Sequence, residues 1–327
     1  MLSAGFFESA EPVDVSIIDM NFSMVEGISH PSWRFVTDEI ADSFPREMWG
    51  QVWRELGIKW LAQLVQDLGG SYKQYESWNF LLLSAESEKD SEAMLRTGEN
   101  AVAAIETRLK PLLNREEMYG KHVMLAFTDQ DDYYSYVSYF YPDGRHTQSS
   151  GVYLAKGYYH IAFTLSDLCQ PGMVITHELT HNALRHIRLP LWLNEGVSVK
   201  IENEIGGGIR RSILDADLAE LHHAYWNSQT IQEFWAGTSF HKDPDSQKLS
   251  YSLAEIMITL MIQDHGWDNV LKFVESATRV DAGLDSSFKY LNRPIDVIAK
   301  EFLGPGDWRP NRDVILGMLR QKKRPRH

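Results

Sequence analysis

The sequence predicts an α+β protein in which a small mixed sheet is followed by a helical half. Up to about residue 163, apolar runs typical of strands alternate with amphipathic helical patterns, an order that is typical of a mixed sheet. Beyond residue 171 nearly every pattern is helical. Between the halves, residues 173–184 contain no proline or glycine, carry apolar residues at helical spacing, and include His177-Glu178-Leu179-Thr180-His181.

Length and composition are those of a globular protein with a sizeable core. The chain has 327 residues, about two domains' worth, with 43% hydrophobic and 24% charged residues. A net charge of −13 opposes nucleic-acid binding through a general positive field. The single cysteine, Cys169, excludes an intramolecular disulfide and a four-cysteine zinc site.

We expect a soluble, cytoplasmic protein with no membrane span. Residues 1–8 lack a basic segment followed by the apolar run of a signal peptide. No uninterrupted apolar stretch reaches the length of about 18 residues that a transmembrane helix needs. The basic residues 320–327 predict a solvated tail, with a weak partner-binding role as the alternative.

Residues 1–70 are expected to form an N-terminal extension. Residues 13–18 predict a short strand, and Pro45 suits the first turn of a helix. Apolar residues then recur at helical spacing over 46–68, until Gly69-Gly70 ends the helix. This long amphipathic helix could pack on the main domain or form a homodimer with a second subunit. Membrane-surface binding is disfavoured because its polar face is not strongly basic.

Residues 71–170 are expected to form the sheet subdomain. They contain two predicted strands, two predicted helices and a hairpin whose arms are separated by Lys156-Gly157. The strands are 77–84 and 122–127, the helices 90–113 and 129–139, and the hairpin arms 151–155 and 158–163.

Residues 171–310 are expected to contain the central helix and a helical lobe, and 311–327 a basic tail. Pro190 ends the central helix because proline cannot continue it. The lobe consists of a helix over 192–202 closed by glycines 206–208, further helices at 213–236, 249–263, 267–278 and 294–303, and a loop at 237–249.

The five residues 177–181 are the strongest functional signal. On a helix, His177 and His181 lie on one face and can present two imidazoles to one ion. Zn²⁺ accepts such nitrogen ligands at about 2.0–2.1 Å, and its catalytic sites leave one position for water. Glu178 is placed to take a proton from that water. The alternative is a chance motif whose histidines are ordinary polar residues on a helix face.

A zinc site of this kind needs a third protein ligand. The nearby candidates are His186, Glu195 and Glu202, and histidines more distant in the sequence are further candidates. A chain that turns at Pro190 can run back antiparallel, and the rise of about 1.5 Å per residue returns Glu195 to the level of the two histidines. A carboxylate there would complete a His₂Glu set. The alternative is a solvated helical glutamate.

The segment Leu191-Trp192-Leu193-Asn194-Glu195-Gly196 resembles the W-L-x-E-G element that follows His-Glu-x-x-His in the gluzincin metallopeptidases of the peptidase MA-like group. Residues 250–254, Ser-Tyr-Ser-Leu-Ala, look like a downstream helix of that family. The resemblance spans about residues 77–303 and implies a thermolysin-like domain. A metzincin is excluded because position 184 is Leu and position 187 is Ile.

The resemblance implies that His177, His181 and Glu195 bind one zinc ion and that Glu178 is the general base for cleaving a peptide or protein substrate. It also implies that Tyr251 donates a hydrogen bond to the oxyanion. The alternative for Tyr251 is a core residue on an apolar helix. His222, His223 and His241 are weaker candidates for the same donor.

One position departs from the family. Thermolysin-like relatives often carry Asp four residues after the third ligand, where this chain has Val199; Asn194 or Ser198 would have to replace it. Strand 158–163 is expected either to be a sheet edge that pairs with extended substrate or simply to complete the sheet. Two other functions stay open: a metallopeptidase-like binding protein with little or no activity, and a zinc hydrolase of non-peptide amides or esters.

Overall fold

The computed structural model describes residues 12–114, 119–141, 150–165, 170–205 and 216–322. The chain divides into two compact units. The first comprises residues 1–108 with 113–182, and the second comprises residues 109–112 with 183–327. None of the described helices combines the length and apolar character that a membrane crossing needs.

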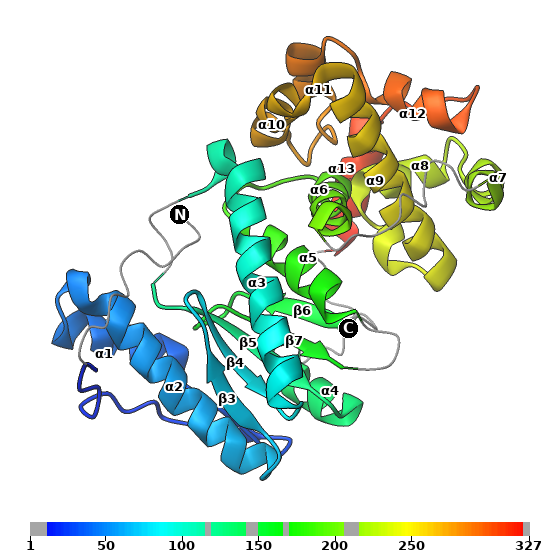
Figure 1. The fold of residues 1–327 in the computed structure, drawn as a ribbon. Coiled ribbons are helices and arrows are strands. Elements are labelled where there is room, and N and C mark those ends of the chain that lie inside the picture. Colours follow the sequence, from blue (N-terminus) through cyan, green and yellow to red (C-terminus); the bar gives the residue numbers. More distant parts are fainter. Residues whose placement is uncertain (1–11, 115–118, 142–149, 166–169, 206–215, 323–327) are drawn as a thin grey trace. The chain divides into compact units, whose positions relative to one another are not determined.

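The first unit is built on a five-stranded mixed sheet with the strand order β3-β4-β5-β7-β6 (Figure 1). Strands β4, β5 and β7 are parallel, while β3 and β6 are antiparallel to their neighbours and form the two edges. The predicted α+β class with a mixed sheet is therefore confirmed. The strands are β3 Lys73–Glu76, β4 Phe80–Ser84, β5 His122–Phe127, β6 Gly151–Leu154 and β7 His160–Thr164.

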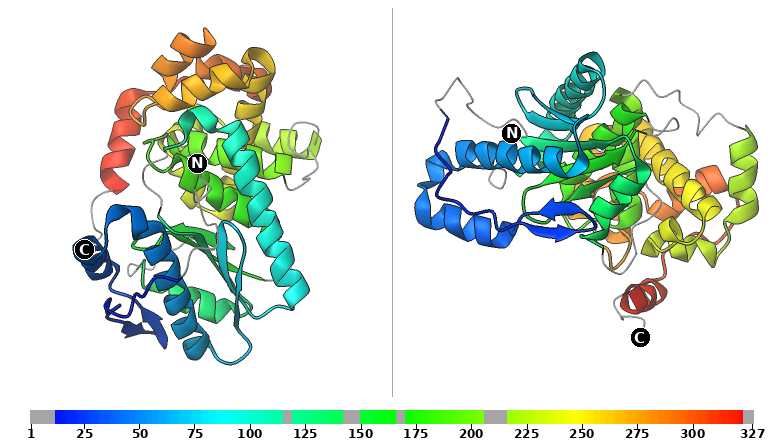
Figure 2. Two further views of the ribbon diagram at one scale, coloured as in Figure 1. Left: turned by 60° about the vertical axis from the view of Figure 1, so that its left-hand side comes forward. Right: turned by 90° about the horizontal axis from the view of Figure 1, so that it is seen from below.

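Helices cover both faces of this sheet. In β4 successive side chains point to opposite faces: Leu81 reaches α2 at Gly57, and Phe80 reaches α3 at Gly98. Because neither glycine has a Cβ, both helices approach the strand closely. In the left view of Figure 2, strands of the sheet lie between α2 (blue) and α3 (cyan). The helices of the unit are α1 Trp33–Ser43, α2 Trp49–Leu68, α3 Glu88–Arg108, α4 Gln130–Ser138 and α5 Pro171–Leu184.

The predicted long helix is α2, and it belongs to the core of the first unit. Pro45 precedes a short 3-10 turn, Arg46–Met48, and Gly69 ends the helix with a φ of +93°. Its apolar face is buried with strand residues in a single core cluster. A dimer through this helix would therefore have to use its polar face. The buried residues are Val52, Trp53, Leu56, Gly57, Trp60, Leu61 and Leu64.

The strand predicted over residues 13–18 does not form. The Asp14 and Asp19 carboxylates accept hydrogen bonds from the backbone N–H groups of Ser16 and Asn21, at 2.8 and 3.0 Å, and such local bonds favour turns over a sheet ladder. A separate two-stranded hairpin follows instead, made of β1 Ser23–Val25 and β2 Ile28–His30.

Strand β7 lies inside the sheet, between β5 and β6, so the suggestion that strand 158–163 is an edge is wrong. The edge beside it is β6. His160 of β7 faces the α2 side, where its Nδ1 donates to the Tyr158 carbonyl oxygen at 2.6 Å and its Nε2 accepts the Tyr136 hydroxyl at 2.6 Å. Burial lowers the pKa of His160 to about 4.

The second unit is helical, as predicted for this half of the chain. Helix α6 packs closely on α9: a Cβ at Gly196 would lie 2.7 Å from the carbonyl oxygen of Ala254. Trp192 is fully buried and donates its indole N–H to the Ala282 carbonyl at 3.1 Å. The helices are α6 Leu191–Ile205, α7 Ala216–Tyr225, α8 Thr230–Ala236, α9 Pro244–His265, α10 Trp267–Ser276, α11 Leu284–Leu291, α12 Ile295–Leu303 and α13 Arg312–Lys322.

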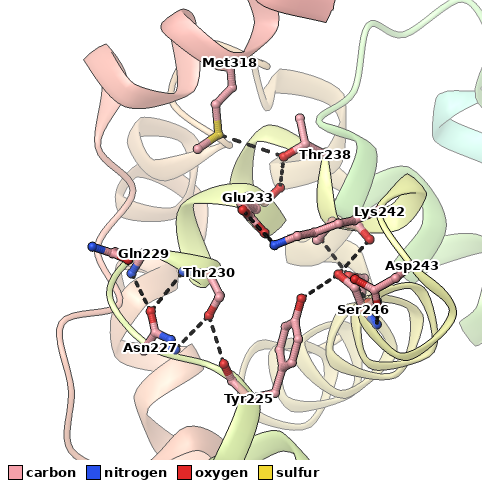
Figure 3. Close-up of polar contacts among 12 residues, drawn as sticks. Tyr225, Asn227, Gln229, Thr230, Glu233, Thr238, Lys242, Asp243, Ser246 and Met318 are labelled. Carbon is pink, nitrogen blue, oxygen red and sulfur yellow. Dashed lines mark hydrogen bonds and ion pairs between the residues drawn. The ribbon is translucent and has the colours of Figure 1, made fainter.

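Polar side chains hold the turn between α7 and α8 to the start of α9 (Figure 3). The Asn227 side chain accepts hydrogen bonds from the N–H groups of Gln229, which precedes α8, and of Thr230, the first residue of α8, at 2.9 and 3.1 Å. Tyr225 donates to Ser246 at 2.7 Å, and Asp243 caps α9 by accepting the Ser246 N–H at 2.8 Å. This cap starts α9 at Pro244, inside the segment that was predicted to be a loop.

Three helices lie where the sequence pattern did not indicate one. Helix α1 lies ahead of the predicted long helix. Helix α11 falls between two predicted helices, and α13 occupies most of the predicted basic tail, with Ile315 fully buried. The glycines at 206–208, predicted to close α6, lie outside the described residues.

Candidate metal centre

Helix α5 carries both histidines of the motif. Ile175 and Leu179 are fully buried on one side, whereas His177 and His181 are half-buried on another. The buried hydroxyl of Thr180 donates a hydrogen bond to the carbonyl oxygen of Thr176, one turn earlier in the helix, at 2.9 Å. Burial of the apolar side thus sets which way the two imidazoles face.

The two imidazoles converge on one point. The Nε2 atoms of His177 and His181 are 3.0 Å apart, and their ring planes are inclined at 81°. Two nitrogens bound tetrahedrally to one zinc ion at about 2.05 Å would lie roughly 3.3 Å apart. A small side-chain adjustment would therefore bring both nitrogens to a single ion.

Glu195 lies on α6, which begins directly after Pro190, and its side chain is buried, with 7% of it exposed. One ligand atom from each of His177, His181 and Glu195 lies within 4.8 Å of the other two. Two imidazole nitrogens and a carboxylate oxygen are a donor set that suits Zn²⁺. In the described parts of the chain no other group of three His, Cys, Asp or Glu converges in this way, so His186 and Glu202 are not brought together with the histidine pair.

Glu178 is tied to the edge strand of the sheet. One carboxylate oxygen, Oε2, accepts the backbone N–H of Tyr153 at 2.8 Å, and the Tyr153 hydroxyl donates to Oδ1 of Asn182 at 2.7 Å. Burial, together with the negative charge of Glu178, raises the pKa of Tyr141. Sequence reasoning missed both tyrosines. Tyr153 precedes the start of α5 by 18 positions and Tyr141 by 30. The predicted hairpin was a signal that could have pointed to Tyr153, and no predicted element contained Tyr141.

Tyr251 lies near the start of α9. It is half-buried, and its ring packs edge-on against Phe240 with 5.2 Å between centroids. Tyr251 precedes Ala254 by three residues, so both lie on the same side of the helix, and Ala254 is the residue that meets Gly196 of α6. Tyr251 is thus on the side of α9 that meets the helix carrying Glu195, and its catalytic role stays a prediction.

Two of the alternative donors are engaged elsewhere in the helical unit. Trp226 donates its indole N–H to Nδ1 of His222 at 2.9 Å, so Nε2 of His222 carries the proton and donates to the Ser252 hydroxyl at 3.0 Å. Burial lowers the pKa of His222 to about 4. His223 donates to the Phe302 carbonyl at 2.9 Å.

Position 199, where relatives of the suggested family carry an Asp, is a half-buried Val. Of the two residues expected to replace that Asp, Ser198 is fully buried and Asn194 is half-buried on α6. Their action on the ligand imidazoles stays a prediction.

No known family model matches the sequence, and no curated protein matches it either. Among solved structures, one similar chain is described as the crystal structure of a functionally unknown conserved protein from Bacillus anthracis str. Ames. The two chains share 12% identity with a TM-score of 0.39, over 82% of this chain and 55% of the other. The chain therefore spans about half the length of that protein, and a likeness this low carries no information about function.

Proposed function

We propose that the protein is a zinc-dependent hydrolase that cleaves peptide bonds, with His177, His181 and Glu195 as the zinc ligands and Glu178 as the general base. The observation that supports it most is the convergence of these three ligand atoms within 4.8 Å. The resemblance of residues 191–196 to the gluzincin element points to the same three residues.

The donor set fits a catalytic site better than a structural one. Structural zinc sites use four protein ligands, commonly cysteines, whereas catalytic sites use three and leave a position for water. Among the residues that the structure describes, the group has three members. Zinc held by them would supply a Lewis acid that lowers the pKa of a bound water from 15.7 to about 7.

Glu178 follows the first ligand directly, and the hydrogen bond from Tyr153 to its Oε2 leaves the other carboxylate oxygen to accept a proton. The proton held there is then delivered to the leaving amine. Tyr251 is our candidate for the hydroxyl that donates to the oxyanion.

Metal analysis and peptide cleavage test the proposal together. Purified protein should hold about one equivalent of zinc, which His177→Ala and Glu195→Ala should lose. Glu178→Gln should keep the zinc and lose cleavage of a peptide library. Absence of zinc from the wild-type protein would refute the site, and full activity of Glu178→Gln would refute the base. Bound zinc without peptide cleavage would favour a binding protein or a hydrolase of non-peptide amides or esters.

A further inference from the structure

Strand β6 is held against one stripe of helix α5. A Cβ at Gly151 would lie 2.3 Å from Cγ1 of Val174, which is closer than any real contact. Two residues further along the strand, Tyr153 bonds to Glu178 and Asn182. The three contacted helix residues are spaced four apart, and such residues form one line along a helix. The edge strand therefore follows the helix line that contains Glu178.

Tyr153 makes two polar contacts with helix α5. Its backbone N–H donates to Oε2 of Glu178 at 2.8 Å, and its hydroxyl donates to Oδ1 of Asn182 at 2.7 Å. Both distances lie in the range of good hydrogen bonds, and the first is to an ionisable carboxylate, which strengthens it. Asn182 is 3% exposed, so its bond with Tyr153 is formed away from water.

The strand offers a firm base for these contacts. Tyr153 is paired with Ile161 of β7, and β7 is bonded on its other side to β5 inside the sheet. Tyr153 is held in the sheet by its strand and is hydrogen-bonded to two residues of α5. These bonds limit both the rotamer of Glu178 and the rotation of α5 about its axis. Catalytic groups need such support because a misplacement of about 1 Å can cost a factor of about 100 in rate.

We propose that Tyr153 is the positioning residue of the candidate site: it fixes the carboxylate of Glu178 through its backbone and the helical turn of His181 through the hydroxyl contact with Asn182. This inference rests on the proposed function for its catalytic consequence. Tyr153 does not reach the reacting atoms in this assignment. It acts through Glu178 and through Asn182, the neighbour of His181.

A double-mutant cycle in the full chain tests the proposal. Tyr153→Phe keeps the ring and removes the hydroxyl, and Asn182→Ala removes its acceptor. We expect each variant to lower kcat by about tenfold with KM changed less than twofold, and to weaken zinc affinity by about tenfold in competition with a chromophoric chelator. The double variant should lose less than the product of the two single losses, because both changes break the same hydrogen bond between Tyr153 and Asn182.

Tyr72→Phe is the matched control. It removes the hydroxyl of a buried tyrosine in the same unit, one that contacts Thr128 rather than α5. It should leave kcat and zinc affinity unchanged. If Tyr153→Phe behaves like this control, or if the two losses multiply in the double variant, the positioning role is refuted.

Hydrogen exchange at the Tyr153 amide separates this inference from the proposed function. Its N–H is bonded to Glu178, so Glu178→Ala should speed exchange at least tenfold, with or without zinc. A wild-type protein that binds zinc but cleaves nothing would refute peptide hydrolysis, while the zinc-affinity cycle would still decide the role of Tyr153. An unchanged exchange rate would refute the backbone contact even if the protein is an active peptidase.

Discussion

Replacing Gly196 by alanine tests whether the close approach of α6 to α9 is required. In an open helix, Gly→Ala stabilises by about 1 kcal/mol because glycine has more backbone entropy to lose. Here the new Cβ would meet the Ala254 carbonyl oxygen at 2.7 Å and Cγ1 of Ile258 at 2.9 Å. The carbonyl belongs to the α9 backbone and cannot rotate away, so the helices must separate by several tenths of an ångström.

Overpacking of this kind costs about 1–3 kcal/mol, and we expect Gly196→Ala to lower the free energy of unfolding by that amount. Gly317 in α13 provides the control, because it is helical and exposed and a Cβ there would meet nothing within 4 Å. Gly317→Ala should be neutral or stabilising by up to about 1 kcal/mol. The two variants should therefore differ by roughly 1–4 kcal/mol in the free energy of unfolding, measured by urea denaturation followed by circular dichroism.

The same substitution should weaken zinc binding, because Gly196 directly follows Glu195 and a shift of about 0.5 Å is enough to degrade a ligand set. A Gly196→Ala protein as stable as Gly317→Ala would refute the packing argument. Lost stability with unchanged zinc affinity would show that Glu195 is not coupled to the contact between the helices.

Further predictions concern pH, the half-buried carboxylate of Glu99 and metal. Burial lowers the pKa of His160 to about 4, so between about pH 6.5 and pH 4 the unfolded chain binds a proton that the folded chain does not. The free energy of unfolding should therefore fall by about 3 kcal/mol as the pH drops from about 6.5 to about 4. The urea midpoints at pH 5 and 7.5 should lie closer together in His160→Gln than in the wild-type protein, with a difference remaining because burial also lowers the pKa of His222 to about 4; acid sensitivity equal to that of the wild-type protein would contradict this. Glu99 accepts two hydrogen bonds from Asn79, at 2.8 and 2.6 Å. Glu99→Ala should lower the free energy of unfolding by about 1–3 kcal/mol, whereas Glu92→Ala at an exposed position should lower it by under about 0.5 kcal/mol. Similar melting temperatures for both variants would contradict a stabilising role of the Asn79–Glu99 bonds. Zinc at 100 times its Kd should stabilise the wild-type protein by about 2.7 kcal/mol but not Glu195→Ala, and an equal gain in both would point to binding elsewhere.

Elements with a strong local signal were predicted well from the sequence. Strand β5 was predicted at its observed bounds, and α2 began after Pro45 and ended at Gly69 because these residues act through their own backbone preferences. Elements with weak local signals were missed. Asp14 and Asp19 made turns where a strand was predicted, and Asp243 started α9 earlier than its apolar pattern indicated.

Strand order could not be read from the chain. The hairpin of residues 151–164 was predicted, but which arm formed the edge depended on whether β7 paired with β5, a contact between segments that are far apart in sequence. Local patterns carry no information about such a pairing, because either arm of an apolar hairpin can fill an interior position.

The sequence by itself determined the candidate ligands: His177 and His181 are four apart on one helix, and Pro190 turns the chain so that Glu195 can return to them. These are short-range relations set by helical geometry. Only the tertiary structure decided that Tyr153 meets Glu178 and Asn182, and that Gly196 meets Ala254. Both contacts join elements through side chains and backbone groups that no spacing rule connects, since packing of the folded elements alone brings them together.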